Sequence, residues 1–157
     1  MYPILSDEDV ARLLPFEKAV QAIEQALLAK AQGQMVSPPR FSVSAGGGSL
    51  VFTAGAETAF SHTLGVRLYD TFADRSPGHA QLVAVFDSQT GVFKGLVIGD
   101  LIGGMRTAAI NAVAIRHMAR RDAHRLGILG AGFQARLHLQ AALAVHPFER
   151  IQVYSPT

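Results

Sequence analysis

The stretch RLGILGAGFQA, residues 125–135, constrains the fold of this chain more than any other segment. Its apolar first half predicts a short strand, and the glycine pattern G-x-G-x-x-A follows at residues 130–135. In this pattern the first glycine allows a tight turn, the second lets backbone approach a pyrophosphate, and the small third residue lets helix and strand pack closely. The following ARLHLQAALAV predicts a helix and RIQVYS a second strand. The segment therefore indicates the start of a dinucleotide-binding fold; an ordinary tight turn between strand and helix is the alternative.

The composition is that of a globular protein of 157 residues, 49% hydrophobic and 17% charged. A formal net charge of +2 is too small to indicate a nucleic-acid partner. The absence of cysteine excludes disulfides, thiolate metal sites and a cysteine nucleophile, and it fits a cytoplasmic location. MYPILSDEDV lacks the features of a signal peptide, and Lys94, Asp100 and Arg106 interrupt the most apolar region, so we expect no membrane partner.

The first hundred residues predict two helices followed by a sheet. The helices are expected at about 6–13, capped by Ser6, and from Pro15 to about Gln32. Residues 37–99 predict a mostly antiparallel sheet of about five strands, with hairpin turns at the glycines 46–48 and at SQTG, 88–91. In LGVRLYDTF, residues 64–72, alternation puts one set of side chains on each face: Leu64, Val66 and Leu68 on one, and Arg67, Tyr69 and Thr71 on the other.

A further helix is expected to open after the glycines at 103 and 104 and to run to about Arg121. Its predicted buried stripe comprises Ile110, Val113, Ala114 and His117. The resulting fold class is α/β: an N-terminal α+β domain with a mostly antiparallel sheet at 1–122, followed at 123–157 by the first βαβ unit of a truncated Rossmann-type domain. Because such a domain needs several βα units, the sequence looks cut short at Thr157.

Three arginines are candidates for anion binding. Arg40 follows two prolines, Arg67 lies in the middle of a strand, and Arg106 starts a helix. An arginine in an apolar, alternating strand must face a wet cleft or pair with an anion, which makes Arg67 the most informative. Each alone is commonly a surface residue, whereas three converging guanidinium groups would grip a carboxylate. The histidine spacing predicts no metal site, and no catalytic residue can be assigned.

The succession SPPR, LGVRLYDTF, DSQTGVFKGLVIGD, MRTAA and GILGAGFQARLH resembles the ornithine cyclodeaminase/mu-crystallin family over essentially the whole chain. The resemblance implies a homodimer of two-domain subunits. In each subunit the N-terminal domain, here 1–122, would supply dimer contacts and substrate binding. A Rossmann domain, beginning here at 123, would bind NAD(P). The implied chemistry is redox chemistry at the α-carbon of amino acids.

The resemblance also implies roles for individual residues. Arg40 and Arg106 match carboxylate-binding arginines, whereas Arg67 falls where many members have a substrate-contacting lysine. Arginine keeps the charge but does not readily lose a proton, which favours a carboxylate clamp over a base. The segment VYSPT carries no acidic residue for a ribose, which favours NADP over NAD. The predicted cofactor-binding residues are Thr107, Gly130, Ala131, Gly132, Phe133, Gln134, Ala135 and Ser155.

The predicted function is an NAD(P)-dependent oxidoreductase that acts at the α-carbon of an amino or imino acid, as an imine or ketimine reductase or an amino-acid dehydrogenase. One alternative is ornithine cyclodeaminase, a lyase that forms proline and ammonia and uses NAD catalytically; Arg67 weakens it. Another is a non-catalytic, crystallin-like binding protein or an inactive fragment. Half a Rossmann domain would expose a sheet edge, so we expect the isolated chain to be poorly soluble.

Overall fold

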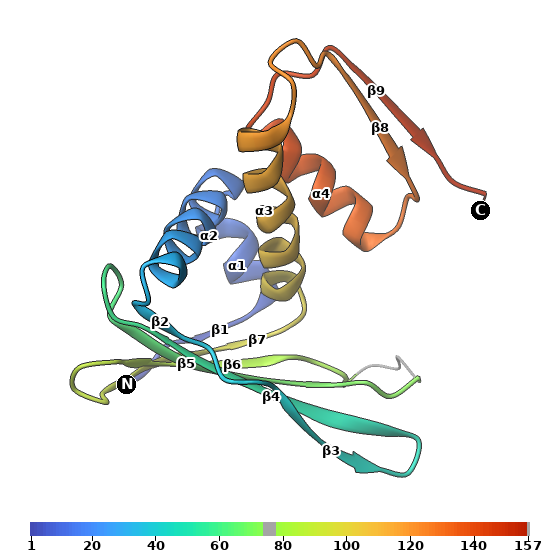
Figure 1. Ribbon diagram of the computed structural model, residues 1–157. Coiled ribbons are helices and arrows are strands. Elements are labelled where there is room, and N and C mark those ends of the chain that lie inside the picture. Colours follow the sequence, from blue (N-terminus) through green and yellow to red (C-terminus); the bar gives the residue numbers. More distant parts are fainter. Residues whose placement is uncertain (74–77, 157) are drawn as a thin grey trace. The chain divides into compact units, whose positions relative to one another are not determined.

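The computed structural model describes residues 1–73 and 78–156, which form two compact units (Figure 1). Unit 1 comprises Met1–Ala11 and Gln25–Asp100, and unit 2 comprises Arg12–Glu24 and Leu101–Thr157. The α/β fold class is confirmed by the mixture of helices, antiparallel sheet and parallel strand pair. The division into functional domains at 1–122 and 123–157 stays a prediction. Thr157, the last residue of the second predicted domain, lies outside the described part of the chain.

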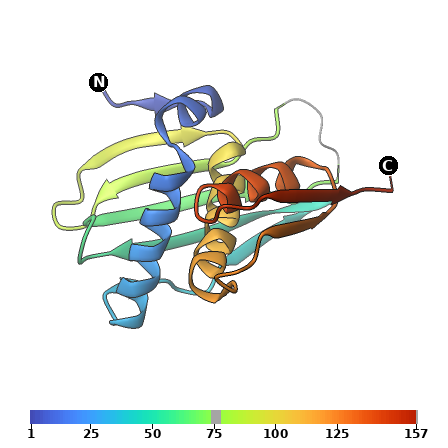
Figure 2. The same ribbon diagram turned by 90° about the horizontal axis from the view of Figure 1, so that it is seen from above.

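Unit 1 is built on a seven-stranded sheet in the order β1-β7-β6-β5-β4-β2, with β3 also paired to β4 (Figure 2). The strands are β1 (Ile4–Leu5), β2 (Met35–Val36), β3 (Phe41–Ala45), β4 (Gly48–Glu57), β5 (Thr63–Asp70), β6 (Leu82–Asp87) and β7 (Phe93–Ile98). Every pairing is antiparallel except that of β1 with β7. The mostly antiparallel sheet is therefore as predicted. The sequence pattern misses β1 and β2, because two residues are too few to show alternation.

The turn between β6 and β7 is the hairpin that the sequence predicts. Gly91 adopts a positive φ of 71°, which a glycine reaches without strain. The Asp87 carboxylate accepts hydrogen bonds from the backbone N–H groups of Thr90 and Gln89, at 2.9 and 3.0 Å, and lies 3.1 Å from the Lys94 ammonium. These donors, the Thr90 N–H foremost, hold the pKa of Asp87 well below its usual range.

The turn between β4 and β5 is organised by one buried carboxylate, that of Glu57, which is 8% exposed. It accepts hydrogen bonds from three backbone N–H groups, those of Ala59 at 2.5 Å, Phe60 at 2.9 Å and Ser61 at 2.6 Å, and from the Ser61 hydroxyl at 2.7 Å. The bonds from Ser61 contribute most to lowering the pKa of Glu57, from 4.5 to about 2. The charged carboxylate thus closes the turn that sets the register of β4 against β5.

One face of this sheet is largely apolar, apart from Asp70 at the end of β5, and we call it the apolar sheet face. The register places Phe41 beside Phe52, Val66 beside Ala54 and Ala84, and Ile4 beside Leu96 on this face. The Phe41 and Phe52 rings stack with centroids 4.8 Å apart. Many of its side chains are solvent-exposed: Ile4, Phe41, Val43, Leu50, Leu64, Val66 and Ile98. Exposed apolar surfaces of this kind are typical of interaction sites.

The helices α1 (Asp7–Leu13) and α2 (Phe16–Ala31) lie where the sequence predicts, and each contributes residues to both units. Ser6 caps α1: its Oγ accepts a hydrogen bond from the Asp9 N–H at 3.3 Å, while the Asp9 carboxylate accepts one from the Ser6 N–H at 3.1 Å. This reciprocal pair satisfies two donors at the start of the helix. Within 1–73 and 78–156, no helix combines the length and apolar character needed to cross a membrane.

Unit 2 contains α3 (Leu101–Met118), α4 (Phe133–Leu143) and a parallel strand pair, β8 (Arg125–Leu129) and β9 (Arg150–Tyr154). The strand, helix and strand after residue 124 are as predicted. The predicted start of α3 is wrong, because the helix begins at Leu101 and includes both glycines, and it ends at Met118 rather than near Arg121. A Cβ at Gly104 would lie 2.5 Å from Leu137 and 2.8 Å from Phe133 of α4, so the glycine allows the two helices to approach closely.

The predicted buried stripe of α3 is also wrong, except at Val113. Ile110 is 41% exposed, and Ala114 and His117 are exposed as well. The buried face consists mainly of small residues: Gly104, Met105, Ala108, Ala109, Ala112 and Val113. Because α3 packs closely against α4, residue size selects its buried face more than hydrophobicity does.

We expect Glu57→Gln to destabilise unit 1 in a pH-dependent way. The folded-state pKa of about 2 lies below the ordinary value of 4.5, so the charged form contributes stability above pH 4.5, and this contribution is lost as pH falls through about 2. Urea unfolding at pH 7, 4.5 and 2.5 should show the gap between wild type and variant narrowing as the pH falls. A gap that is the same at all three pH values would contradict the role of the charge.

Candidate functional site

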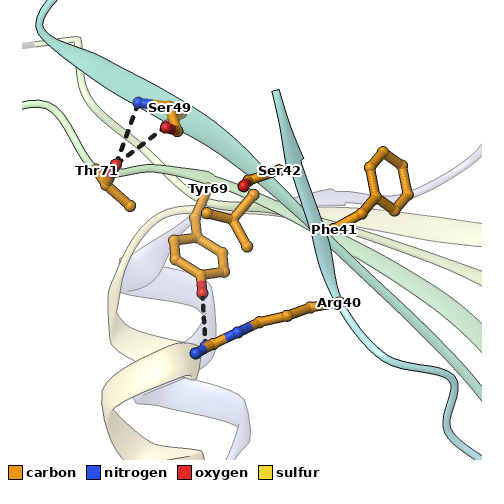
Figure 3. Close-up of a pocket in the computed structure, with 7 residues that line it drawn as sticks. Arg40, Phe41, Ser42, Ser49, Tyr69 and Thr71 are labelled. Atoms are coloured by element: carbon orange, nitrogen blue, oxygen red, sulfur yellow. Dashed lines mark hydrogen bonds between the residues drawn. The ribbon is translucent and has the colours of Figure 1, made fainter. Parts of the chain in front are cut away.

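A polar pocket opens on the face of the sheet opposite the apolar sheet face, and we call it the arginine–tyrosine pocket (Figure 3). Its volume is about 380 Å³, and it is lined by Arg40, Phe41, Ser42, Ser49, Val51, Tyr69 and Thr71. Figure 3 shows the Arg40 side chain extending to the Tyr69 hydroxyl, whereas the Phe41 ring points away from it. The Arg40 Nη1 donates a long hydrogen bond of 3.5 Å to that hydroxyl. The pocket therefore combines a cation with several hydroxyl groups.

The second predicted arginine, Arg67, does not line the pocket but contacts the same tyrosine. Arg67 and Tyr69 are two residues apart on β5 and so share a face, and the Arg67 guanidinium carbon lies 4.3 Å from the centre of the Tyr69 ring. One tyrosine thus holds a guanidinium group over its ring and another at its hydroxyl. Arg67 lies in β5, whereas Arg40 directly precedes β3. Guanidinium groups are suited to an anionic ligand such as a carboxylate.

Arg67 is also fixed from its other side. Its Nε donates a 2.8 Å hydrogen bond to Oε1 of Gln81, which immediately precedes β6. Gln81 in turn donates from Nε2 to Asp100 Oδ1 at 2.9 Å. The guanidinium is therefore held between an aromatic ring and an amide, both of which belong to unit 1.

The glycine pattern forms a tight turn between β8 and α4 of unit 2, as predicted. Gly130 adopts a positive φ of 103°, and its N–H donates a 2.7 Å hydrogen bond to the carbonyl of Tyr154. Gly132 caps α4 in an extended conformation, with no side-chain hydrogen bond to the first turn. The N–H groups at the start of a helix point outward along its axis, where they favour an anion.

The turn borders a small cavity of about 210 Å³, lined by Ile128, Gly130, Ala131, Ala135, Arg136, Leu139 and Val153. The small side chain of Ala135 lies where α4 approaches the strands. A Cβ added at Gly132 would meet no atom of the chain within 4 Å, so neither packing nor backbone conformation requires a glycine there. The residues therefore fit a dinucleotide, because close approach of an external group would explain the missing side chain.

The remaining predicted site residues are distributed over unit 2. Arg106 and Thr107 lie in the second turn of α3, where Arg106 is exposed and the Thr107 hydroxyl donates to the Gly103 carbonyl at 3.0 Å. Phe133 and Gln134 form the exposed first turn of α4. Ser155 is half-buried and directly follows Tyr154, whose carbonyl holds the glycine turn. Their roles stay predictions.

The sequence reasoning missed several residues of the pocket. Tyr69 and Thr71 could have been found, because alternation already places them on the same face as Arg67. Ser42 comes from β3, and only the register of the β3–β4 hairpin brings it beside Val51. Ser49 lies two residues before Val51 on β4 and so shares its face. Gln81 gives no sequence signal, since its contacts reach 14 and 19 residues along the chain.

Comparison with known proteins identifies relatives along the whole chain. The model of the ornithine cyclodeaminase/mu-crystallin family matches residues 3–157. The iminosuccinate reductase of Paracoccus denitrificans is 28% identical over 158 residues, which cover 98% of this chain and 49% of the relative. A Delta(1)-pyrroline-2-carboxylate/Delta(1)-piperideine-2-carboxylate reductase of Azospirillum brasilense is 29% identical over 153 residues, 96% of this chain and 49% of the relative. The chain thus spans about half the length of these curated relatives.

Solved structures share the fold. The crystal structure of the Paracoccus denitrificans iminosuccinate reductase, in complex with NAD+, matches with a TM-score of 0.90 and 28% identity over 99% of this chain and 50% of that one. The Thermococcus litoralis Delta(1)-pyrroline-2-carboxylate reductase, in complex with NADH and L-proline, matches with a TM-score of 0.86 and 28% identity over 98% and 49% of the respective chains.

The two glycines of the turn should respond differently to alanine. Gly130→Ala is expected to destabilise the fold by about 1 kcal/mol or more, because alanine is strained at a positive φ. Gly132→Ala should leave stability nearly unchanged but weaken NADH or NADPH binding by the full-length protein at least tenfold, by about 1.4 kcal/mol. Thermal unfolding and fluorescence titration measure the two effects. Wild-type dinucleotide affinity in Gly132→Ala would argue against a phosphate at this turn.

Proposed function

The chain belongs to the ornithine cyclodeaminase/mu-crystallin family, and on that premise we propose that the protein is an NAD(P)-dependent reductase of α-imino acids. The observation that carries the proposal is the pair of guanidinium groups on Tyr69, one at its hydroxyl and one over its ring. The named activities of the relatives, iminosuccinate reductase and Delta(1)-pyrroline-2-carboxylate reductase, support the same class of substrate. All these substrates carry a carboxylate beside an imine carbon.

In this proposal the glycine turn holds the dinucleotide. The N–H groups at the start of α4 and the backbone of Gly130 to Gly132 contact the pyrophosphate, with Ala135 leaving room for it. When bound, the cofactor supplies the hydride. Two related structures contain NAD+ and NADH, whereas Ser155 in this chain offers no carboxylate to a ribose and favours NADP. Titration with both reduced dinucleotides distinguishes them.

The arginines bind and orient the substrate. Arg40 and Arg67 would grip the carboxylate, which their contacts with Tyr69 support, and Arg106 is proposed as a further carboxylate ligand. Orientation of this kind brings the imine carbon to a fixed position, which is the protein's main contribution to a hydride transfer. An arginine side chain does not readily lose its proton, so Arg67 is proposed as a clamp and not as a base.

Ornithine cyclodeaminase remains the second candidate, because the family includes that activity. Cyclodeamination regenerates its NAD+, whereas imine reduction consumes one reduced dinucleotide for each product. Net oxidation of NADH or NADPH with cyclic or open imino acids supports the reductase. Ammonia release from ornithine without net cofactor change would instead identify the lyase, and dinucleotide binding without either reaction would indicate a binding protein.

We further propose that the apolar sheet face associates with the same face of a second copy. An apolar surface can pack against the same surface of another copy. A two-fold axis then buries the same residues of both copies in one interface. Its exposed side chains come from β1, β3, β4, β5 and β7, so the surface extends across the whole sheet. A surface of this breadth is suited to a permanent interface.

Arg106→Leu in the full-length protein is expected to raise KM for an imino acid about tenfold or more, because a charge-assisted contact to the carboxylate is lost. The change in kcat should be smaller. Steady-state kinetics with NAD(P)H measures both. Arg121→Leu, at another exposed arginine of unit 2, is the matched control and should behave like wild type. An unchanged KM in Arg106→Leu would remove this residue from the site.

Val66→Lys is expected to convert the dimer to a monomer, since it places a charge in the middle of the apolar sheet face. Analytical ultracentrifugation of the full-length protein measures the change. Val92→Lys introduces the same charge at a more exposed position, in the turn before β7, and should leave the dimer intact. A wild-type protein that sediments as a monomer would refute the proposed association.

A further inference from the structure

Gln81 joins Arg67 to Asp100 through both ends of one amide. Its Oε1 accepts from Arg67 Nε at 2.8 Å, and its Nε2 donates to Asp100 Oδ1 at 2.9 Å. The backbone N–H of Asp100 donates in turn to Asp7 Oδ2 at 3.1 Å. All four residues belong to unit 1, so the chain of bonds runs from a sheet strand to the end of β7 and the start of α1.

The two neighbours of Gln81 fix which way its amide points. A flipped amide would direct its NH2 group at the Arg67 guanidinium and its carbonyl at the Asp100 carboxylate. Both contacts would be repulsive, because each places like groups together. Asp100 therefore keeps the carbonyl oxygen of Gln81 turned toward Arg67.

This amide restrains the guanidinium without neutralising it. The guanidinium carbon lies 4.3 Å from the centre of the Tyr69 ring, and Nε donates to Gln81, so both residues restrain the guanidinium. A glutamate at position 81 would provide an acceptor as well, but it would also add a negative charge beside the cation. A neutral acceptor adds no negative charge beside the guanidinium.

The side chain of Gln81 is not needed to hold the sheet together. Its backbone carbonyl accepts a 3.0 Å hydrogen bond from the Gly99 N–H, and β6 pairs with β7 from Leu82 onward. These backbone bonds persist whatever side chain stands at position 81. The half-buried side chain of Gln81 instead hydrogen-bonds Arg67 and Asp100.

We propose that Gln81 is a positioning residue that orients the Arg67 guanidinium toward the substrate carboxylate. The proposal rests on the function proposed above, in which Arg67 grips that carboxylate. Gln81 acts only through Arg67 and touches neither the imine carbon nor the cofactor. By restraining the guanidinium before the substrate binds, Gln81 lowers the conformational entropy that Arg67 loses on binding.

Two variants of the full-length protein test this role. Gln81→Leu keeps the approximate size but removes the acceptor, and Gln81→Glu keeps an acceptor but adds a charge. Both are expected to raise KM for an imino acid about tenfold, with kcat changed less than threefold. Gln89→Leu is the matched control, because the Gln89 amide hydrogen-bonds His62, away from the arginines.

A second readout separates positioning from general stability. The wild-type preference for a carboxylate substrate over the matching carboxamide should shrink about tenfold in Gln81→Leu, since only the carboxylate uses the charge of Arg67. The affinity for pyruvate, a simple 2-oxo carboxylate, should fall by the same factor in calorimetric titration. A loss of folding alone would lower both substrates' rates equally.

The outcomes distinguish the positioning role from the proposed function. Active wild-type protein with unchanged KM, preference and pyruvate affinity in both variants overturns the role of Gln81 and leaves the function standing. Wild-type protein that neither reduces imino acids nor binds pyruvate overturns the function, and the positioning role with it. The expected losses in both variants, with a normal Gln89→Leu, support the two together.

Discussion

The register of β4 against β5 is the constraint on which the pocket depends. Side chains alternate along a strand, so a slip of one residue would turn Arg67 and Tyr69 to the opposite face. The buried carboxylate of Glu57 favours the observed register, because it accepts hydrogen bonds from the N–H groups of the turn that joins the two strands. A carboxylate remote from any proposed chemistry thereby contributes to placing Arg67 on its face of the sheet.

The same alternation gives β5 two roles. Arg67 and Tyr69 lie on one face, where a carboxylate is proposed to bind, while Leu64, Val66 and Leu68 belong to the apolar sheet face proposed to meet a second copy. The two proposed surfaces are therefore separated only by the thickness of the sheet. Association through one face would hold the strands that carry the other, which links the stability of the pocket to that of the dimer.

Much of this arrangement could be predicted from the sequence, and the failures have physical causes. The glycine turn and the alternation in β5 are local patterns, so residues 125–135 and 64–72 indicated their structure directly. The glycines 103 and 104 suggested a break before a helix, whereas they lie inside α3 because Gly104 accommodates Leu137 and Phe133. The pairing of β1 with β7 and the bonds of Gln81 join distant segments, and no local pattern reports such contacts.

The contact at Gly104 has a mechanical consequence. Phe133, the first residue of α4, directly follows the Gly132 cap, and its ring lies against α3 one turn after that helix begins. Because Gly104 has no side chain, α3 and α4 lie in close contact at this point. A larger residue at position 104 would have to displace Phe133, and with it the start of α4 that is proposed to face the phosphates. The size of one residue in α3 therefore limits where the proposed phosphate-binding turn can lie within unit 2.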